Sequence, residues 1–363
     1  MPPMPSPRTS IRALAAWLAL LACVAFATRA TAQATGGADA DELPPLLPEK
    51  VTLAAHESIQ KGCKFLASSQ ARDGSWRSDG QFGTYPTTMT ALAGLALLSS
   101  GSTTTRGPHA PQLRKAVTYL LESSRPDGLI TRAEDGRSMY GHGFATLFLS
   151  QVYGAEEDLE RARKIHRALA RAVLLTARSQ SKLGGWLYTP DSGGDEGSVT
   201  VTQIQALRGC KNAGVQVPRS TIDMAVKYIA GSAQPDGGIA YRSGMSGSRP
   251  AISAAAVATL YNAGKYDDPM ARKCLEYCKR NVRVEGGSVG GWYYYAHFYM
   301  AQAMWQVGGA DWDRYFPKMR DRLVRTQQQS GSWDGDGIGR VFGTAIACLI
   351  LQLPYEHLPV LMR

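Results

Sequence analysis

Two kinds of helical segment alternate along the chain. In the first kind, apolar residues recur at i, i+3, i+4 and i+7 beside a charged face, which predicts amphipathic helices that border solvent. These segments span residues 56–70, 111–124, 165–180, 220–234, 268–281 and 316–329. The second kind is nearly uncharged all round, which predicts helices that are buried or line an interior. These segments span residues 87–100, 140–153, 199–213, 252–263, 293–307 and 342–353.

Breakers rich in Gly or Pro follow each segment of the first kind, so the chain divides into six helical hairpins. Such hairpins can stack as an open solenoid or close into a ring. An open solenoid needs polar caps at both ends, yet the last segment, "VFGTAIACLILQL", is as apolar as the middle ones. The pattern therefore predicts an all-α fold, an α6/α6 toroid over residues 51–363 with the uncharged helices inside.

A glutamine, a glycine and a tryptophan recur at fixed offsets where three of the amphipathic segments end. Glycine permits a sharp exit from the helix, tryptophan buries a large flat surface, and glutamine satisfies backbone groups at a helix end. We interpret the repeat as a structural brace between neighbouring hairpins, with a catalytic role for the tryptophans as the alternative. The three copies are Gln70, Gly74 and Trp76; Gln180, Gly184 and Trp186; and Gln327, Gly331 and Trp333.

The stretch "FLASSQARDGSW" resembles the QW repeat of squalene-hopene and oxidosqualene cyclases. Their superfamily also includes protein prenyltransferase β subunits and complement-type thioester domains. The likeness covers about residues 55–350, although the second copy has Ser124 and Ile130 at the Gln and Trp places, the fourth has Ala240, and the fifth is stretched before Trp292. The resemblance implies the α/α toroid and a central cavity for an isoprenoid-type ligand.

The catalytic motifs of these relatives are missing. The nearest string to the acidic Asp-x-Asp-Asp of type II terpene cyclases is "YDDP", where Asp267 and Asp268 are placed to cap a helix. No Asp-x-Cys of the prenyltransferase zinc site lies in an inner segment, and the sequences around Cys63 and Cys210 do not match a thioester motif. We therefore expect no metal and no cofactor, and leave open whether the protein is an enzyme.

The polar candidates for ligand binding lie where the inner segments begin. In a toroid these six ends meet at one rim, where free N–H groups and helix dipoles favour an anionic or electron-rich ligand. A Tyr-x-His pattern occurs there in the second and fifth hairpins, which face each other across the ring, so the two imidazoles can contact opposite ends of one ligand. The alternative is that each histidine fills a packing slot. The candidates are Tyr140, His142, Phe144, Arg249, Tyr295, His297, Tyr299 and Arg340, where the arginines hold an anion or simply occupy surface loops.

Two acidic loops precede inner segments. "DSGGDEG" offers Asp191, Asp195 and Glu196, which suit glycoside hydrolysis as a pair of carboxylates, although acids in this position usually cap the helix. "DGDGIG", with Asp334 and Asp336, resembles part of a calcium loop without the distant Glu that completes one, so we expect a turn.

Residues 1–32 have the layout of a secretory signal peptide. Arg8 and Arg12 precede an apolar run from 13 to 27, and a small-residue cleavage site follows. The run is too short for a comfortable transmembrane helix, and no later segment is apolar enough to span a bilayer. We expect an exported protein, periplasmic or extracellular, with a Pro-rich linker over residues 33–50; a lipid anchor on Cys23 is the alternative.

The charge pattern argues against a nucleic-acid partner, and the cysteine spacing argues against a disulfide framework. The net charge is +10, but the basic residues are scattered and form no block interleaved with aromatics, so we expect no nucleic-acid partner. Five cysteines follow the signal at irregular spacings, which does not indicate a disulfide framework, although one disulfide is possible.

Three function classes stay open. The resemblance favours a toroid that handles an isoprenoid or another lipid. The missing catalytic motifs favour a non-catalytic module that binds a protein partner. A secreted glycan lyase or hydrolase is the third possibility, because α/α toroids also carry those activities.

Overall fold

The structure is a computed structural model that describes residues 46–190, 193–286 and 292–362. The predicted signal peptide and most of the predicted linker lie outside these residues. Within the described ranges, no helix has both the length and the apolar character that a membrane span requires.

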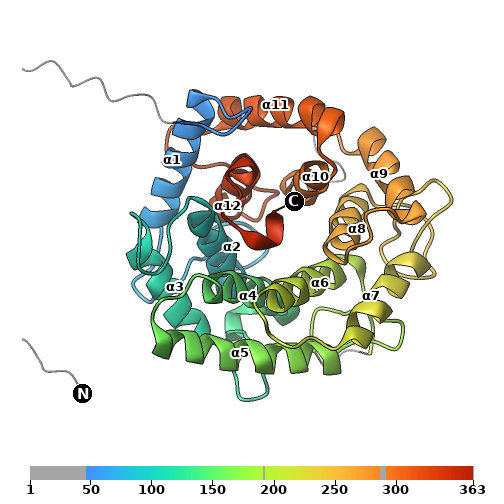
Figure 1. The fold of residues 1–363 in the computed structure, drawn as a ribbon, viewed down its shortest axis with the longest axis horizontal. Helices are drawn as coiled ribbons and strands as arrows, with labels where there is room; N and C mark the ends of the chain where they lie inside the picture. The colour runs from blue at the N-terminus through green and yellow to red at the C-terminus, as the bar shows by residue number, and fades with distance from the viewer. Residues whose placement is uncertain (1–45, 191–192, 287–291, 363) are drawn as a thin grey trace, which may run out of the picture. The chain divides into compact units, whose positions relative to one another are not determined.

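Among the described residues of the unit Leu47–Arg363, twelve α-helices alternate between an outer and an inner layer (Figure 1). The outer helices are α1 (Leu53–Ser68), α3 (Ala110–Glu122), α5 (Leu159–Arg178), α7 (Arg219–Gly231), α9 (Pro269–Asn281) and α11 (Gly309–Thr326). The inner helices are α2 (Pro86–Ser99), α4 (Ser138–Tyr153), α6 (Gly197–Asn212), α8 (Pro250–Asn262), α10 (Tyr293–Val307) and α12 (Arg340–Leu351).

The ring is closed. The last inner helix, α12, packs against both α10 and the first inner helix, α2, while α1 packs against α11 and α12. Figure 1, viewed down the ring, shows α1 beside α11 in the outer layer. The predicted α6/α6 toroid is confirmed, and with it the inner and outer placement of the two kinds of segment.

Burial follows the charge pattern that distinguishes the two layers. Every residue of α2 is buried, whereas α5 buries one apolar face and presents its basic residues outward. Small residues let the inner helices approach closely: a Cβ placed on Gly94 of α2 would lie 2.5 Å from the ring of Phe148 on α4. Close packing of this kind explains why the inner segments carry so many small residues.

Each Gln-Gly-Trp repeat joins one outer helix to the next. The Nε2 of Gln70 donates 2.9 Å hydrogen bonds to the carbonyls of Gly74 and Gln112, and thereby reaches from the end of α1 to α3. The indole N–H of Trp76, a fully buried side chain, donates to the carbonyl of Leu66 at 2.7 Å. The other two copies make the same contacts around Gln180 and Trp186 and around Gln327 and Trp333.

The C-terminal segment covers the end of the ring at which the inner helices finish. It contains two short 3-10 helices, η2 (Leu353–Tyr355) and η3 (Pro359–Leu361), and the chain end lies over the centre in Figure 1. The backbone N–H of Val360 donates to Gln151 on α4, and the ring of His357 bonds the carbonyl of Ser99 on α2. Access to the interior is therefore left to the opposite end, the amino-terminal rim at which the inner helices begin.

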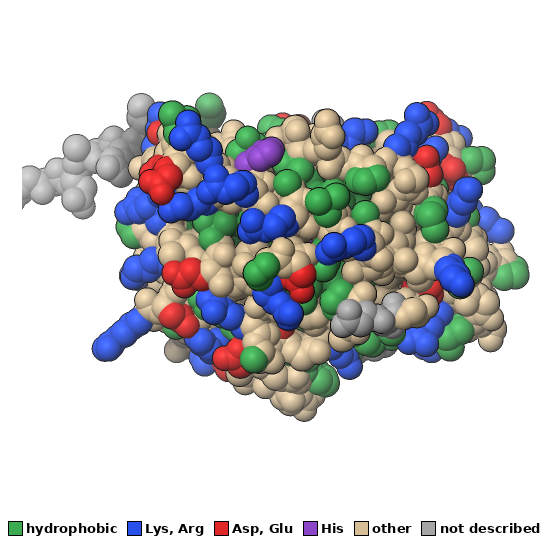
Figure 2. Space-filling view, turned by 90° about the horizontal axis from the view of Figure 1, so that it is seen from below, with side chains coloured by type: hydrophobic (Ala, Val, Ile, Leu, Met, Phe, Trp, Pro, Cys, Tyr) green, Lys and Arg blue, Asp and Glu red, His purple; other side chains and the backbone are tan. Residues whose placement is uncertain are grey.

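The surface carries its charges in a mixed pattern. Figure 2 shows basic side chains spread over one face and interspersed with acidic and hydrophobic ones, without a continuous basic block.

Candidate functional site at the amino-terminal rim

Two tyrosines from opposite hairpins meet at one serine of the amino-terminal rim. The hydroxyl of Tyr140 on α4 shares a hydrogen bond with the hydroxyl of Ser198 on α6. The hydroxyl of Tyr295 on α10 reaches the backbone carbonyl of the same serine at 3.5 Å. Burial raises the pKa of both phenols well above the ordinary value, so both stay neutral. The structure thus brings together the two tyrosines that the sequence placed at one height.

The aromatic cluster extends around the rim. The ring of Tyr188 lies 6.0 Å from that of Tyr140, and its hydroxyl shares a hydrogen bond with that of Tyr241. The guanidinium of Arg137 lies 4.5 Å above the centre of the Tyr188 ring, a cation–π contact. These tyrosines are half-buried, so part of each side chain is accessible to a molecule that arrives at the rim.

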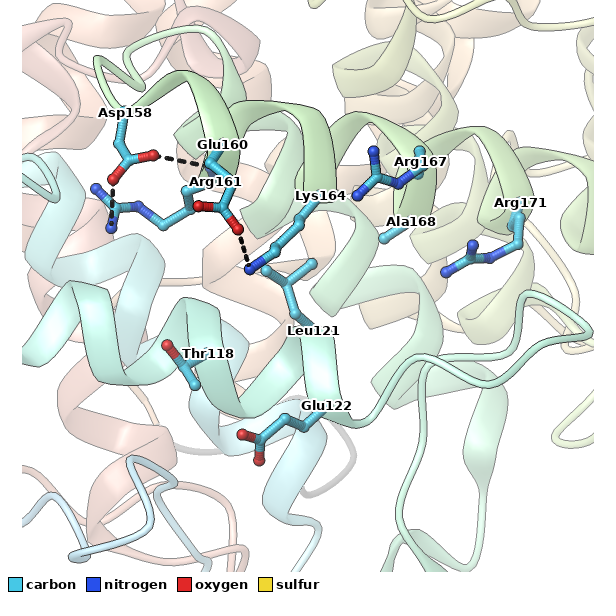
Figure 3. A pocket seen from close by; sticks show the side chains of 10 residues that line it. All are labelled: Thr118, Leu121, Glu122, Asp158, Glu160, Arg161, Lys164, Arg167, Ala168 and Arg171. Carbon is cyan, nitrogen blue, oxygen red and sulfur yellow. Dashed lines mark hydrogen bonds and ion pairs between the residues drawn. The ribbon is translucent and has the colours of Figure 1, made fainter.

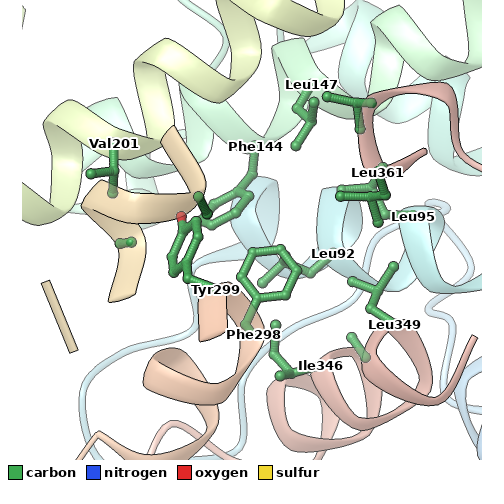
Figure 4. Close-up of a cluster of buried hydrophobic side chains, with 14 of the residues drawn as sticks. Leu92, Leu95, Phe144, Leu147, Val201, Phe298, Tyr299, Ile346, Leu349 and Leu361 are labelled. Carbon is green, nitrogen blue, oxygen red and sulfur yellow. The ribbon is translucent and has the colours of Figure 1, made fainter. Parts of the chain in front are cut away.

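Aromatic side chains continue from the rim into the centre. The ring of Tyr295 lies 5.1 Å from that of Tyr299, which in turn lies 4.8 Å from Phe298; Phe298 lies 6.5 Å from Phe144 across the ring. Figure 4 shows Tyr299, Phe298 and Phe144 in one buried cluster with Leu361 of the C-terminal segment and with aliphatic residues of the inner helices. The cluster therefore packs the interior that the sequence analysis predicted as a cavity.

The two candidate histidines point toward the outer layer. The Nε2 of His142 bonds the hydroxyl of Thr176 on α5 at 3.0 Å, and its Nδ1 accepts from the N–H of Ile130 at 3.2 Å. The ring of His297 bonds the hydroxyl of Tyr315 on α11 at 2.9 Å and the carbonyl of Arg283 at 3.2 Å. Both nitrogens of each ring are occupied, so the hypothesis that the imidazoles contact two ends of one ligand is wrong in this geometry, and the packing alternative describes them.

Burial dominates the electrostatics of these histidines. Both side chains are fully buried, and desolvation lowers the pKa of each imidazole to about 4. Both rings are therefore neutral near pH 7, and they join the inner helices to the outer layer.

Carboxylates already occupy the N–H groups at the start of four inner helices. The carboxylate of Asp79 accepts a hydrogen bond from the backbone N–H of Arg340 in α12 at 2.8 Å. The carboxylate of Asp135 accepts one from the backbone N–H of Thr87 in α2 at 3.0 Å. In the same way, Asp336 accepts from Tyr294 and Tyr295 of α10, and Glu196 accepts from Ser198 and Val199 of α6. The expectation that free N–H groups here favour an anion is therefore wrong for these helices, because the protein supplies the anions itself.

Glu196 is the most deeply buried acid beside the tyrosines. Burial raises the pKa of its carboxyl, while the hydroxyl and N–H of Ser198 and the N–H of Val199 act in the opposite direction by stabilising the carboxylate. Both oxygens accept hydrogen bonds, from the hydroxyl of Ser198 at 2.8 and 2.7 Å and from the backbone. The carboxyl group of Glu196 therefore caps α6, and both of its oxygens are engaged within the protein.

The other acidic candidates are also engaged. The carboxylate of Asp195 is buried and accepts from the hydroxyl of Ser181 at 2.6 Å, while Asp191 lies outside the described residues. Asp268 caps α9 through the N–H of Met270 at 2.8 Å, which confirms the predicted capping role. Of the described candidates, Asp195 and Glu196 are both buried and hydrogen-bonded, so these two do not form the open pair of acids that glycoside hydrolysis needs.

The two candidate arginines lie at exposed positions. Arg249 is exposed immediately before α8. Arg340 is half-exposed, and its Nε pairs with the carboxylate of Asp79 at 2.8 Å. Sequence reasoning did not identify Asp79 and Asp135; each lies in the breaker that precedes an inner segment, beside other acids that do not cap the helix.

Neither a cluster of metal ligands nor a surface pocket adds a further feature to the described part of the amino-terminal rim. Among the residues that the structure describes, no group of three His, Cys, Asp or Glu side chains could hold a metal ion. A pocket of about 460 Å³ lies on the outside between α3 and α5, where acids alternate with Arg161, Lys164, Arg167 and Arg171 (Figure 3). None of the predicted ligand-binding residues lines this pocket.

Comparisons with known proteins agree with the toroid. No protein-family profile matches the chain. Drimenyl diphosphate synthase of Streptomyces showdoensis is 31% identical over 149 residues, which is 40% of this chain and only 26% of that enzyme. The match therefore spans about a quarter of the relative's length.

Solved structures resemble the chain over most of its length. The type II terpene cyclase MstE of Scytonema superposes with a TM-score of 0.59 at 15% identity and covers 84% of this chain and 99% of its own. An α-1,6-mannanase of Salegentibacter superposes with a TM-score of 0.58 at 10% identity and covers 82% of this chain and 98% of its own. At these identities the likeness shows the fold alone: the chain is an α/α toroid of the kind seen in terpene cyclases and in a mannanase.

Proposed function

We propose that the toroid binds a neutral, largely apolar molecule of the isoprenoid type at its amino-terminal rim. The observation that carries this proposal is the continuous series of aromatic rings from Tyr140 and Tyr295 at the rim, through Tyr299 and Phe298, to Phe144 at the centre. Aromatic faces stabilise apolar chains by burial and positive charge by their quadrupoles. MstE, which shares the fold, has been solved with geranylgeranyl dihydroxybenzoate as its substrate, which supports the same ligand class here.

The acidic caps favour a neutral ligand over a diphosphate. Asp79, Asp135, Glu196 and Asp336 use the N–H groups of four inner helices that a phosphate would otherwise bind. A diphosphate at the rim would lose these donors and would also meet carboxylates. An alcohol or hydrocarbon meets neither penalty, and its hydroxyl can bond to a rim tyrosine.

Binding, not cyclisation, is the activity that we propose. Protonation of an alkene needs a carboxylic acid whose proton faces the substrate, whereas both oxygens of Glu196 accept hydrogen bonds. Export directed by residues 1–32 is part of the proposal, and it would place the protein where membrane lipids, not prenyl diphosphates, are the available isoprenoids.

A ligand must displace part of the interior or lie across the rim, because the central cluster is packed. We expect the half-buried rim tyrosines to contact the ligand first. Their side chains can move outward to admit it with less rearrangement than the packed central cluster would need. The test is a titration of the full chain with geranylgeraniol and, separately, with geranylgeranyl diphosphate, followed by tryptophan and tyrosine fluorescence. Saturable binding of the alcohol supports the proposal, and absence of binding of both ligands overturns it.

A second candidate function is a protein-binding module. It is favoured by one observation besides the packed interior: Phe82 and Trp292 are both exposed, at 47% and 43%, and their rings lie 5.9 Å apart. Exposed aromatic pairs of this kind are common anchors of protein interfaces. Loss of a partner from pull-downs with Phe82→Ser, without loss of isoprenoid binding, would distinguish this function from the first.

A further inference from the structure

Two cysteines face each other across the seam at which the ring closes. Cys63 lies on α1 and Cys348 on α12, and their side chains are 2% and 0% exposed. The two thiols are close enough for each to shift the pKa of the other. The seam is tight here, because a Cβ placed on Gly62 would lie 2.5 Å from the sulfur of Cys348.

A histidine completes the cluster. The side chain of His109, at the start of α3, is close enough to Cys63 to lower the pKa of its thiol. The interactions with Cys348 and His109 lower the pKa of the Cys63 thiol to about 6, whereas the interaction with Cys63 and burial raise that of Cys348 well above the ordinary value. These contacts favour the thiolate form of Cys63 over that of Cys348, and thiolates are the reactive form of cysteine.

The other described cysteines lack this arrangement. Cys210 is alone, and burial raises the pKa of its thiol to about 12. Cys274 and Cys278 lie one turn apart on α9, where the thiol of Cys274 donates to the carbonyl of Ser253 at 3.4 Å and burial raises the pKa of Cys278. They provide an internal comparison, a thiol pair that no histidine activates.

We propose that Cys63 and Cys348 are a redox-active dithiol that closes as a disulfide across the seam of the toroid. The co-reactant is a low-molecular-weight disulfide. The sulfur of Cys63 attacks one of its sulfurs, forms a mixed disulfide and expels one thiolate. Cys348 then loses its proton to that thiolate or to solvent, and its sulfur attacks Cys63 and expels the second thiolate. Two electrons leave the cysteine pair, and one oxidant disulfide becomes two thiols.

The disulfide would lock the ring. It links the first outer helix to the last inner helix, so it closes almost the whole folded chain into one covalent loop. Cross-links between residues this far apart in sequence restrict the unfolded chain strongly. We therefore expect the oxidised protein to unfold at a higher urea concentration than the reduced protein.

The experiment uses the full chain without substitutions. Reduced protein is incubated with glutathione disulfide, both folded and during refolding from urea, and free thiols are then alkylated. Before alkylation we expect the intact mass to fall by that of two hydrogen atoms, and after it we expect a non-reduced digest to give one cross-linked peptide with Cys63 and Cys348. Alkylation of both cysteines in both arms, or a cross-link between other cysteines, overturns the proposal.

Variants separate the roles of the groups. Cys274→Ser/Cys278→Ser should still form the cross-link, whereas Cys63→Ser should abolish both the cross-link and the redox dependence of the urea midpoint. His109→Asn should slow oxidation several-fold near neutral pH and have little effect above the ordinary thiol pKa, because the thiolate then forms without help. An equal rate at neutral pH would show that His109 does not activate Cys63.

Discussion

The side-chain amide of Gln327 donates a 2.9 Å hydrogen bond to the backbone carbonyl of Ser58. Gln327 follows the last outer helix and Ser58 lies in the first, so this bond crosses the seam of the ring. The same amide also donates to Gly331, as Gln70 does to Gly74 within the first hairpin. The seam is built with the same contacts as the other joints, which explains how hairpins without polar caps form a finished fold.

Loss of this glutamine should weaken the seam. We expect Gln327→Ala to lower the free energy of unfolding by roughly 1–3 kcal/mol, because it removes the two hydrogen bonds from the side-chain amide to the carbonyls of Ser58 and Gly331. Urea unfolding followed by circular dichroism measures the change. Gln70→Ala is the matched control at an internal joint and should cost a similar amount. If Gln327→Ala left the free energy of unfolding unchanged while Gln70→Ala lowered it, the seam would be open in solution.

Replacement of Gly331 by alanine should destabilise the fold more than the same replacement at Gly214, another glycine with a positive φ. Gly331 has φ +85°, and a Cβ there would lie 2.6 Å from the carbonyl oxygen of Lys61. Gly214 has φ +78° with nothing within 4 Å of the same position. We expect Gly214→Ala to cost about 1 kcal/mol from backbone strain alone, and Gly331→Ala roughly 2–4 kcal/mol because of the added clash. Equal thermal shifts in the two variants would contradict this packing.

The buried histidines should make the fold sensitive to acid. The pKa values of His142 and His297 are lowered from 6.5 to about 4 in the folded chain, so the unfolded chain binds protons first as the pH falls. Their contribution is complete above about pH 6.5 and is lost between pH 6.5 and 4, by up to about 3 kcal/mol for each group. Urea unfolding over this range should show a steeper loss in the natural chain than in His142→Asn/His297→Asn. Parallel pH curves would mean that these imidazoles are not buried as neutral rings.

Rim tyrosines should affect ligand binding without being essential to the fold. We expect Tyr188→Leu to weaken geranylgeraniol binding about tenfold, because it removes a half-buried ring that contacts Tyr140 and Tyr241. Tyr266→Leu is the control, since Tyr266 is 47% exposed and stacks on Tyr261, away from these tyrosines. Isothermal titration of both variants measures the difference. Similar losses of affinity would place the ligand elsewhere.

The fold followed from the sequence because its two determinants are local and repeated. The charge contrast between segments separates the layers, and the apolar last segment, 342–353, indicates closure; both reflect burial, which a sequence records directly. The C-terminal segment that covers the end of the ring was not predicted, because Leu353 and Leu361 lie in short 3-10 helices and Leu358 lies between them, without a periodic pattern.

The site was predicted only in part, for physical reasons. Spacing placed Tyr140 and Tyr295 at one height, and the structure joins both to Ser198. The same spacing did not reveal that the histidines turn outward, because a residue two positions along a helix lies on a different face. Long-range caps such as Asp336 on α10 were also missed, since capping is recognised in sequence only when the acid immediately precedes its own helix.

The most direct test of the central claim is a paired measurement of affinity. The full chain is titrated with geranylgeraniol and with geranylgeranyl diphosphate at the same ionic strength, and the two dissociation constants are compared. Because carboxylates occupy the helix N-termini at the rim, we predict that the alcohol binds at least tenfold more tightly than the diphosphate. Tighter binding of the diphosphate would contradict the account of a rim that selects neutral isoprenoids.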